Sequence, residues 1–279
     1  MLSAQEEHLI GYWSFEETGD TIYDHTGNEN HGINYGAVSV SGVKGNALYF
    51  QGRDTESVDD DKSSQANGDF VEIKGPKTPA PAVLRDQGTG SISFWFKVYE
   101  IPSEHGIAPM FYYGTRDKCD HMDAANEGLI IELGHSPIYP KNESLFFTIF
   151  KNGCTFPSCC WDTNSPTSKN EWHHFVGIVG EDYNTGYLDG EELIGRKYNF
   201  GGSDDSQFFA DALSHDKLWI GKGHWDRTEQ YFNGVIDELK IFSEPLTRRE
   251  VKSLYDELNT ATSNQSPGEP GNRLTVYPN

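Results

Sequence analysis

Basic residues are scarce in this sequence. Its 279 residues include only 22 lysines and arginines against 43 aspartates and glutamates, and the formal net charge at pH 7 is −21. Such a charge repels the phosphate backbone of nucleic acids and the surface of anionic membranes. The composition therefore argues against either of these as the main partner. It fits a solvated protein in salty water, where self-repulsion is screened.

Long apolar stretches are also missing. No run approaches the roughly 20 apolar residues that cross a bilayer as a helix, so no membrane span is expected. The start, MLSAQEEHLIG, lacks the basic end and apolar segment of a signal peptide, which either does not exist or precedes this sequence. Hydrophobic residues nevertheless make up 35% of the chain and aromatic residues 13%, enough for a real core, and 29 glycines and 13 prolines predict many turns.

Cysteine occurs only four times. Cys154, Cys159 and Cys160 crowd into GCTFPSCCWDTNSP, and Cys119 lies apart in TRDKCDHMD. A zinc site would need paired cysteines or added histidines at ligand spacing, and His121 is the only candidate nearby. Two disulfides that staple long loops of a secreted protein are the preferred interpretation. The three possible pairings of four cysteines stay open.

Segments with a period of two dominate the chain. In SISFWFKV, Ile92, Phe94, Phe96 and Val98 fall on one face of a predicted strand. The Asp-Gly pair in LDGE, 188–191, predicts a tight hairpin. The further predicted strands are MFYYGTR, GLIIELG, LFFTIFK, WHHFVGIVG, GYLDGEELIG, KLWIGKG and GVIDELKIF. Many short strands without interleaved helices predict an all-β antiparallel sandwich or barrel.

The composition changes near the end of the chain. EPLTRREVKSLYDEL, 244–258, predicts one short helix after a proline. NTATSNQSPGEPGNR, 259–273, has almost no apolar residue and predicts a flexible linker. LTVYPN, 274–279, looks like the opening of another strand. The sequence thus predicts one domain over residues 8–258, a linker, and the start of a further element.

The segment YDHTGNENHG places an oxygen-bearing side chain at every second residue. These are Asp24, Thr26, Asn28 and Asn30. A calcium ion takes six to eight oxygens from carboxylates, amides and carbonyls, and such a spacing suits it. The alternative is a tight turn in which Asp and Asn side chains bond their own backbone. The segment alone leaves both interpretations open.

Eight phrases in order resemble the laminin-G-like, concanavalin A-like jelly-roll family in its bacterial three-part form. They are GYWSFEETGDTIYDHTGNENHG, GVKGNALYFQG, DFVEI, SISFWFKV, EWHHFVGIVG, YLDGEEL, LWIGKG and YFNGVIDELKIFSEPLTRREVKSLY. The resemblance implies a jelly-roll sandwich of two antiparallel sheets, one of them concave. It also implies binding of carbohydrate or of another protein rather than catalysis.

The same resemblance implies that the first and last strands pair, which brings Asp24 close to Asp237 in GVIDEL. These two carboxylates, with oxygens of Asn28, Asn30 and His31, would then enclose one structural calcium ion. The ion would tie the N-terminal loop to the C-terminal strand.

LTVYPN after a polar linker also resembles the opening of the C-terminal sorting domain of the Bacteroidetes type IX secretion route. This resemblance implies a secreted or cell-surface bacterial protein in which the domain is joined to a catalytic or other module. The sorting domain would be truncated here.

The surplus length over a minimal family member lies in loops, where binding residues concentrate on a rigid scaffold. Sugar recognition needs an aromatic face for the pyranose, with polar groups that reach its hydroxyls. Trp161 and Trp225 are the preferred stacking residues. The full set of candidate ligand-binding residues is Trp161, Trp225, His224, Arg227, Tyr112, Tyr113, Arg116, His135 and Tyr139. One of the adjacent tyrosines must point inward.

A local basic patch is conceivable despite the acidic whole. Its candidate members are Arg116, Lys118, Lys151, Lys222 and Arg227. Guanidinium groups bind carboxylates and sulfates bidentately. The patch would suit a sulfated or uronic-acid polysaccharide, including one of marine origin.

Catalytic signatures are absent. Glycoside hydrolases of the jelly-roll class carry an E-x-D-x-E strand, and none exists here, because VIDEL has only Asp237 and Glu238, expected on opposite faces. A polysaccharide lyase is conceivable from His121, His135, Tyr139 and Arg116, but no spacing demands it. The preferred function is a non-catalytic carbohydrate-binding module. The alternatives are a protein-binding adhesion module and a polysaccharide lyase or glycoside hydrolase.

Overall fold

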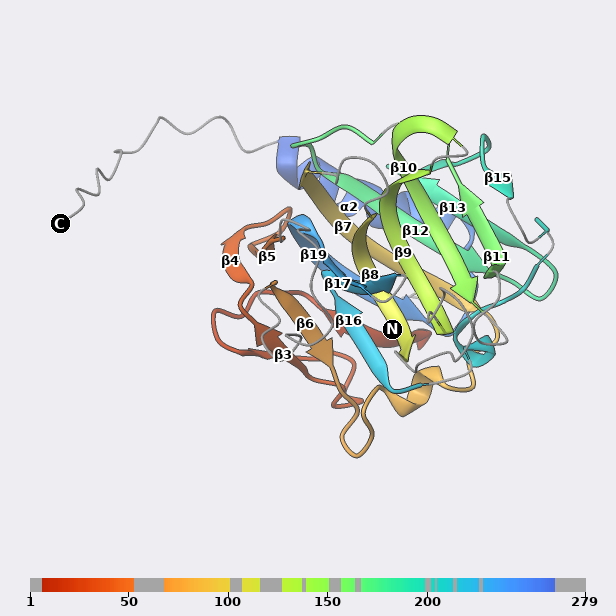
Figure 1. The fold of residues 1–279 in the computed structure, drawn as a ribbon. Coiled ribbons are helices and arrows are strands. Elements are labelled where there is room, and N and C mark those ends of the chain that lie inside the picture. The colour runs from red at the N-terminus through yellow and green to blue at the C-terminus, as the bar shows by residue number, and fades with distance from the viewer. Residues whose placement is uncertain are drawn as a thin grey trace.

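The strands form two large antiparallel sheets that pack face to face, and one separate hairpin (Figure 1). This arrangement in a computed structural model confirms the predicted jelly-roll sandwich. The model describes residues 7–52, 68–100, 107–115, 127–136, 139–150, 157–163, 167–198, 202–203, 205–212, 215–225 and 228–263. Among these residues, no helix has the length and apolarity that a membrane crossing requires.

The eight-stranded sheet has the order β14-β13-β12-β7-β19-β5-β4, with β1 paired to β19. Its strands are β1 Leu9–Trp13, β4 Val38–Ser41, β5 Asn46–Gln51, β7 Gly90–Glu100, β12 His173–Val179, β13 Asn184–Leu188, β14 Glu191–Glu192 and β19 Asn233–Phe242. The predicted hairpin joins β13 to β14, with Asp189 and Gly190 at φ angles of 54° and 77°. Asp tolerates this left-handed region and glycine adopts it freely, which explains the Asp-Gly pair.

The nine-stranded sheet has the order β15-β11-β10-β9-β8-β16-β6-β3-β2. Its strands are β2 Thr21–Ile22, β3 Gly32–Tyr35, β6 Phe70–Ile73, β8 Ile107–Thr115, β9 Glu127–Ser136, β10 Tyr139–Phe150, β11 Pro157–Asp162, β15 Lys197–Tyr198 and β16 Lys217–Ile220. The separate hairpin is β17 Lys222–Trp225 with β18 Thr228–Tyr231, and two short 3-10 turns are η2 Ala82–Leu84 and η3 Phe209–Asp211.

The main core lies between the two sheets. Alternate residues of each strand point into it, among them Phe94 and Phe96 of β7 and Leu129 and Ile131 of β9, all 1% exposed or less. This is the period of two that the sequence shows in SISFWFKV. The intervening residues of each strand therefore face outward. The elements that pack on these two outer faces determine which parts of them are exposed to solvent.

The first and last strands pair, as the family resemblance implied. Tyr12 and Trp13 of β1 lie opposite Lys240 and Leu239 of β19. A register shift against β7 lies between Asp237 and Lys240, and Glu238 there has a φ of 52°. This bulge breaks the alternation of side chains. As a result, Ile236 and Leu239 both enter the main core and the two acids between them both lie on its outer side, so the expectation that they point to opposite faces is wrong.

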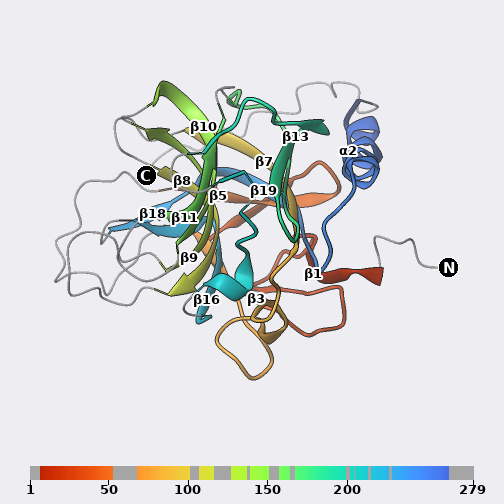
Figure 2. The same cartoon turned by 90° about the vertical axis from the view of Figure 1, so that its right-hand side faces the viewer.

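Helix α2, Arg248–Ser263, covers the outer face of the eight-stranded sheet (Figure 2). Thr247 and Glu250 form a capping box at its start, since Glu250 accepts from the Thr247 backbone N–H at 2.8 Å and the Thr247 hydroxyl accepts from the Glu250 N–H at 3.3 Å. Val251 and Leu254 pack on outward residues of β12. The helix runs five residues past the predicted boundary at 258, although Leu258 is its last buried apolar side chain among the described residues.

The β17–β18 hairpin covers part of the outer face of the nine-stranded sheet, on the side of the molecule opposite α2 (Figure 2). A Cβ atom at Gly223 of β17 would lie 2.6 Å from Pro109 and 3.2 Å from Ile130. Only glycine allows the hairpin backbone to approach β8 and β9 so closely. Towards β6, β3 and β2 this outer face is less covered, and we call it the open face.

Candidate functional site

Four aromatic rings from four neighbouring strands cross the outer face of the nine-stranded sheet, from its covered middle to the open face. Tyr35 of β3 stacks on Phe70 of β6 with ring centroids 4.6 Å apart and an interplanar angle of 14°. Phe70 meets Trp219 of β16 edge-on at 6.3 Å, and Trp219 stacks on Tyr112 of β8 at 5.4 Å. We call these four residues the aromatic row. They share a face because β-strand pairing places them directly or diagonally opposite one another.

Exposure rises steeply along the aromatic row. Tyr112 is 1% exposed and Trp219 6% exposed, whereas Tyr35 is 41% exposed. The β17–β18 hairpin buries the inner end, where the Lys222 ammonium lies 4.4 Å from the Phe70 ring centroid and 4.5 Å from that of Trp219. The row therefore has an anchored end and an accessible end, so the Tyr35 ring is held rigid while one side of it meets solvent.

An acid and two lysines lie beside the accessible end. Glu72 of β6 accepts from Lys74 Nζ at 2.8 Å and from Lys217 Nζ at 3.1 Å, one lysine on each carboxylate oxygen. Burial acts to raise the pKa of the Glu72 carboxyl, but the hydrogen bonds and charges of the two lysines outweigh burial and leave this pKa below its usual value. The hydrogen bond to Glu72 raises the pKa of Lys74. We call Glu72, Lys74 and Lys217 the acid–lysine cluster; its two cations and one anion leave a net charge of +1.

A second carboxyl lies on the same outer face, nearer its middle. Glu132 of β9 stands between Pro109 of β8 and Phe146 of β10 and is 5% exposed. Its Oε2 atom has no hydrogen-bond partner among the described residues, and burial raises the pKa of this carboxyl to about 8. Glu132 is therefore a neutral acid at pH 7, able to donate a proton or one hydrogen bond.

The structure buries both adjacent tyrosines of the predicted ligand set. Tyr113 lies in the main core, 0% exposed, where its hydroxyl bonds His215 Nδ1 at 2.7 Å. Burial raises its pKa well above the usual value, which disfavours a role as a base. Tyr112 points outward, but its ring stacks on Trp219 and it is 1% exposed. Neither tyrosine presents a free ring face for a sugar.

The other predicted ligand-binding residues receive only backbone placement or none. Trp161 in β11 pairs with Phe147 and Tyr198, Trp225 and His224 lie in β17, His135 lies in β9 and Tyr139 begins β10, and the side chains of these five are outside the description. The wholly undescribed candidates are Arg116, Lys118, Lys151 and Arg227. Lys222 is 4% exposed and ion-paired with Glu229 at 3.0 Å, so it offers no charge to a surface patch.

The cysteine prediction also lies largely outside the described residues. Cys119 and Cys154 are not described, and Cys159 and Cys160 are placed only as backbone of β11, opposite Ile149 and Thr148. Both disulfides stay predictions.

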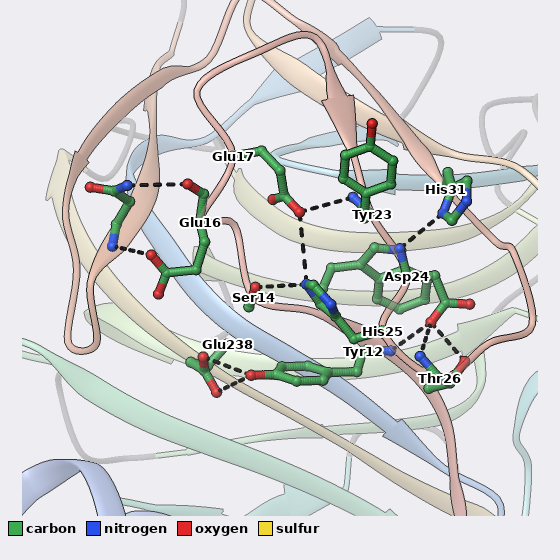
Figure 3. Close-up of polar contacts among 12 residues, drawn as sticks. Tyr12, Ser14, Glu16, Glu17, Tyr23, Asp24, His25, Thr26, His31 and Glu238 are labelled. Atoms are coloured by element: carbon green, nitrogen blue, oxygen red, sulfur yellow. Dashed lines mark hydrogen bonds and ion pairs between the residues drawn. The ribbon is translucent and has the colours of Figure 1, made fainter.

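The loop that carries Asp24 is held by its own hydrogen bonds (Figure 3). Asp24 Oδ1 accepts from the Thr26 backbone N–H at 2.9 Å and hydroxyl at 2.7 Å, and Oδ2 accepts from the Asn30 N–H at 3.1 Å. The Asp24 N–H donates to His31 Nδ1 at 3.0 Å, and the Asn28 amide donates to the Ile10 carbonyl. These contacts fit the turn interpretation, because the carboxylate that would face a cation faces N–H and O–H donors.

Asp237 belongs to a different set of contacts. Its Oδ2 atom accepts from the Val43 N–H at 2.8 Å, whereas Oδ1 is buried without a hydrogen-bond partner among the described residues. Tyr12 lies between the two regions, with its backbone N–H at Asp24 and its hydroxyl at Glu238 (Figure 3). Within the described residues, no group of three or more His, Cys, Asp or Glu side chains is arranged to hold a metal ion. The contacts of the proposed ligands do not fit a shared calcium site, and the ion stays a prediction.

A serine, a histidine and an aspartate meet near the β13–β14 hairpin in an order that resembles a catalytic triad. His173 Nε2 lies 2.8 Å from Ser168 Oγ, and Nδ1 lies 2.8 Å from Asp189 Oδ2. The serine hydroxyl, however, also lies 2.6 Å from Glu171 Oε2, and Nε2 faces the Ser168 carbonyl at 3.2 Å. Burial acts to lower the pKa of His173, but Asp189 outweighs it and the pKa is raised. Both ring nitrogens thus have partners within the loop and Glu171 also holds the Ser168 hydroxyl, so these contacts fasten the loop.

The sequence analysis missed Tyr35, Phe70 and Trp219. Part of their signal is present, because FVEI and KLWI alternate like the other strands, with Val71 and Ile220 inside, whereas GINY turns its apolar Ile33 and Tyr35 outward. What the sequence hides is the strand order that brings three distant segments side by side on one face.

Two antiparallel sheets packed face to face form a β-sandwich, one of the standard layered architectures. The model of the concanavalin A-like lectin/glucanases superfamily matches residues 74–252, more than half of the chain. The chain belongs to this family. No curated protein matches the sequence.

Solved structures share the fold at low sequence identity. Domain 4 of the extracellular arabinanase AbnA from Geobacillus stearothermophilus, in complex with arabinotriose, is 20% identical, with a TM-score of 0.57 over 89% of this chain and 98% of that one. The binding domain of botulinum neurotoxin DC in complex with rat synaptotagmin II is 11% identical, with a TM-score of 0.62, and the match covers 91% of this chain and 52% of that one. Trypanosoma rangeli sialidase in complex with sialic acid is 14% identical, with a TM-score of 0.59, and the match covers 91% of this chain and 34% of that one. The chain thus spans about half of the toxin chain and a third of the sialidase chain.

Proposed function

We propose that this chain is a non-catalytic carbohydrate-binding module that binds a polysaccharide on its open face. The observation that carries the proposal is Tyr35, a ring fixed from one side by Phe70 and free on the other. Such a ring receives the apolar face of a pyranose with little loss of entropy on binding. The acid–lysine cluster beside it supplies donors for the sugar's polar groups. The arabinotriose and sialic acid complexes of proteins with this fold support the proposal.

The proposal is tested by affinity electrophoresis and pull-down against a panel of plant and marine polysaccharides. A binding module is retarded by at least one of them and releases no reducing ends or unsaturated products. Tyr35→Ala removes the retardation, whereas Tyr183→Ala, a comparably exposed tyrosine in the loop before β13, does not. A protein without affinity for any glycan on the panel, but with affinity for a protein partner, is instead an adhesion module.

A polysaccharide-degrading enzyme is the second candidate, and Glu132 is the observation that favours it. A buried acid with a raised pKa on a ligand-binding sheet face has the protonation state of a general acid. Release of product by the native chain and its loss in Glu132→Gln would establish this function and overturn the non-catalytic one.

The remaining context is also proposed rather than observed. The protein is secreted or displayed at the cell surface, its module is joined to others, and residues 274–279 begin a sorting domain. A structural calcium ion predicts that EDTA lowers the melting temperature and that Asp24→Ala weakens calcium binding. An unchanged melting curve in excess EDTA excludes the ion.

A further inference from the structure

We infer that the open face selects a sugar that carries a carboxylate, a uronic acid, over the corresponding neutral sugar. This inference rests on the proposed function and names the ligand class of the same site. It is carried by the geometry of the acid–lysine cluster and by its position next to Tyr35.

The lysines of the cluster face solvent and the acid does not. The side chains of Lys74 and Lys217 are 41% and 38% exposed, against 9% for Glu72. A ligand on Tyr35 therefore meets ammonium groups first. Lys74 also lies close enough to Tyr35 for the two to interact electrostatically. In the register of β3 and β6, Phe70 lies opposite Tyr35 and Glu72 lies opposite Ile33, so the cluster follows Tyr35 along the same face.

The hydrogen-bonding inventory of the cluster favours an acceptor-only group. Each oxygen of Glu72 already accepts from one lysine, so much of its acceptor capacity is used. Each ammonium has three N–H donors and gives one to Glu72, so donors remain in excess. A neutral hydroxyl accepts from an ammonium group without forming an ion pair with it. A carboxylate offers only acceptors and forms charge-assisted hydrogen bonds.

The charge of the whole chain makes this selectivity local. A net charge of −21 repels a polyanion at long range. Any preference for an acidic glycan must therefore come from a few cations at close distance, and only substitutions at those cations change it. A lysine elsewhere on the surface contributes the same formal charge and none of the contacts. Lys252 on α2, which pairs with Asp256 at 2.6 Å on the other side of the molecule, is such a lysine.

The experiment compares two forms of one polymer. Polygalacturonate carries a carboxylate on every ring, and its fully methyl-esterified form keeps the backbone and loses the charge. We expect the native chain to bind polygalacturonate about tenfold more tightly than the ester, as charge-assisted contacts allow. Lys74→Gln and Lys217→Gln each abolish most of this preference, because affinity for polygalacturonate falls further than affinity for the ester. Lys252→Gln changes neither affinity.

Glu72→Gln should change the affinity for polygalacturonate in the opposite direction to the two lysine substitutions. It removes the internal anion and frees both ammonium groups, so affinity for polygalacturonate rises about threefold or more. A merely structural role of the cluster predicts a fall for both polymers instead, with a lower melting temperature. This variant therefore separates recognition from folding.

The outcomes separate this inference from the proposed function. Equal binding of the two polymers, both lost in Tyr35→Ala, leaves a carbohydrate-binding module and overturns the selectivity for acids. A preference that persists in Lys74→Gln and Lys217→Gln also overturns it. Absence of binding to either polymer, with binding to a neutral polysaccharide through Tyr35, overturns the inference alone, and absence of any glycan binding overturns both.

Discussion

Each outer face of the sandwich carries a stacked pair of aromatic rings, but only one of the two pairs is covered by a helix. On the eight-stranded sheet, Trp95 stacks on Tyr255 of α2 at 5.6 Å with an interplanar angle of 12°, and the helix seals it to 3% exposure. On the nine-stranded sheet, Tyr35 stacks on Phe70 in nearly the same geometry but belongs to the sheet itself, and no covering element reaches it among the described residues. A similar stacking geometry thus lies under a helix on one face and reaches solvent on the other.

Each outer face also buries a titratable group that stays neutral. His174 lies 1% exposed under α2, with Nε2 2.9 Å from Ser93 Oγ, and burial followed by the charge of Lys240 lowers its pKa to about 3. Glu132 on the opposite face has a pKa raised to about 8. Because His174 resists gaining a charge in acid and Glu132 resists losing a proton in alkali, these two groups limit stability from opposite ends of the pH scale.

The largest expected effect is on the sealed face. Trp95→Ala removes a buried indole from between the sheet and α2, and we expect a loss of about 3–5 kcal/mol in the free energy of unfolding. Urea denaturation followed by circular dichroism measures it. The matched change on the open face, Tyr35→Ala, costs less than about 1 kcal/mol because the ring is far from fully buried. Equal losses at the two sites would break the distinction between a sealed and an open face.

The next effect concerns Glu132 in alkali. Its folded pKa of about 8 lies above the ordinary value of 4.5, so the native state holds a proton that the unfolded chain has released between these values. Stability due to this group therefore falls as pH rises from 4.5 to 8. Glu132→Gln should leave stability at pH 4.5 nearly unchanged and raise it at pH 8 by roughly 2–4 kcal/mol.

Asp237 provides the internal control for that pH profile. Burial also raises its pKa to about 8, so a fall of the same sign remains in Glu132→Gln. Denaturation at pH 4.5, 6 and 8 on both chains gives the share of Glu132 as the difference between the two slopes. If stability falls with pH equally in the native chain and in Glu132→Gln, then Glu132 ionises as freely in the folded state as in the unfolded state and is accessible to water.

His174 should act in acid. Its folded pKa of about 3 lies below the ordinary 6.5, so the unfolded state binds a proton that the native state refuses between these values. Stability from this group is complete above pH 6.5 and falls as pH drops towards 3. His174→Gln keeps a hydrogen-bonding group near Ser93 and should flatten this acid branch, by roughly 1–3 kcal/mol at pH 4. An unchanged acid branch would place the loss elsewhere, in the carboxylates.

The sequence predicts the sealed face better than the open one. Val251, Leu254 and Leu258 repeat at helical spacing, so the presence of α2 and its apolar side are readable from local pattern. The alternation in SISFWFKV likewise fixes which residues of β7 enter the core. Both inferences depend on neighbours in sequence, and the structure confirms them.

The open face depends on neighbours in space. Tyr35, Phe70 and Trp219 are separated by dozens of residues, and each looks like an ordinary alternate residue of a short strand. Only the order β16-β6-β3 aligns them. Sequence reasoning chose Tyr112 from the same row because it lies in a conspicuous aromatic run, and it had no means of detecting that this ring is buried. The bulge at Glu238 breaks the period of two in the same way, because one residue of extra backbone puts two adjacent acids on the same side of β19.

The smallest effect in energy is the most informative for function. Tyr35→Ala should weaken glycan binding by about 1–2 kcal/mol, roughly five- to thirtyfold, because the ring contributes stacking area that is already ordered before binding. Tyr35→Phe should keep most of that affinity, since it retains the ring and its stack on Phe70 and loses only the hydroxyl. Isothermal titration with the best polysaccharide of the panel measures both variants. If Tyr35→Phe falls as far as Tyr35→Ala, the hydroxyl rather than the ring face carries recognition; if neither falls, the ligand lies elsewhere and the open face is only an uncovered sheet.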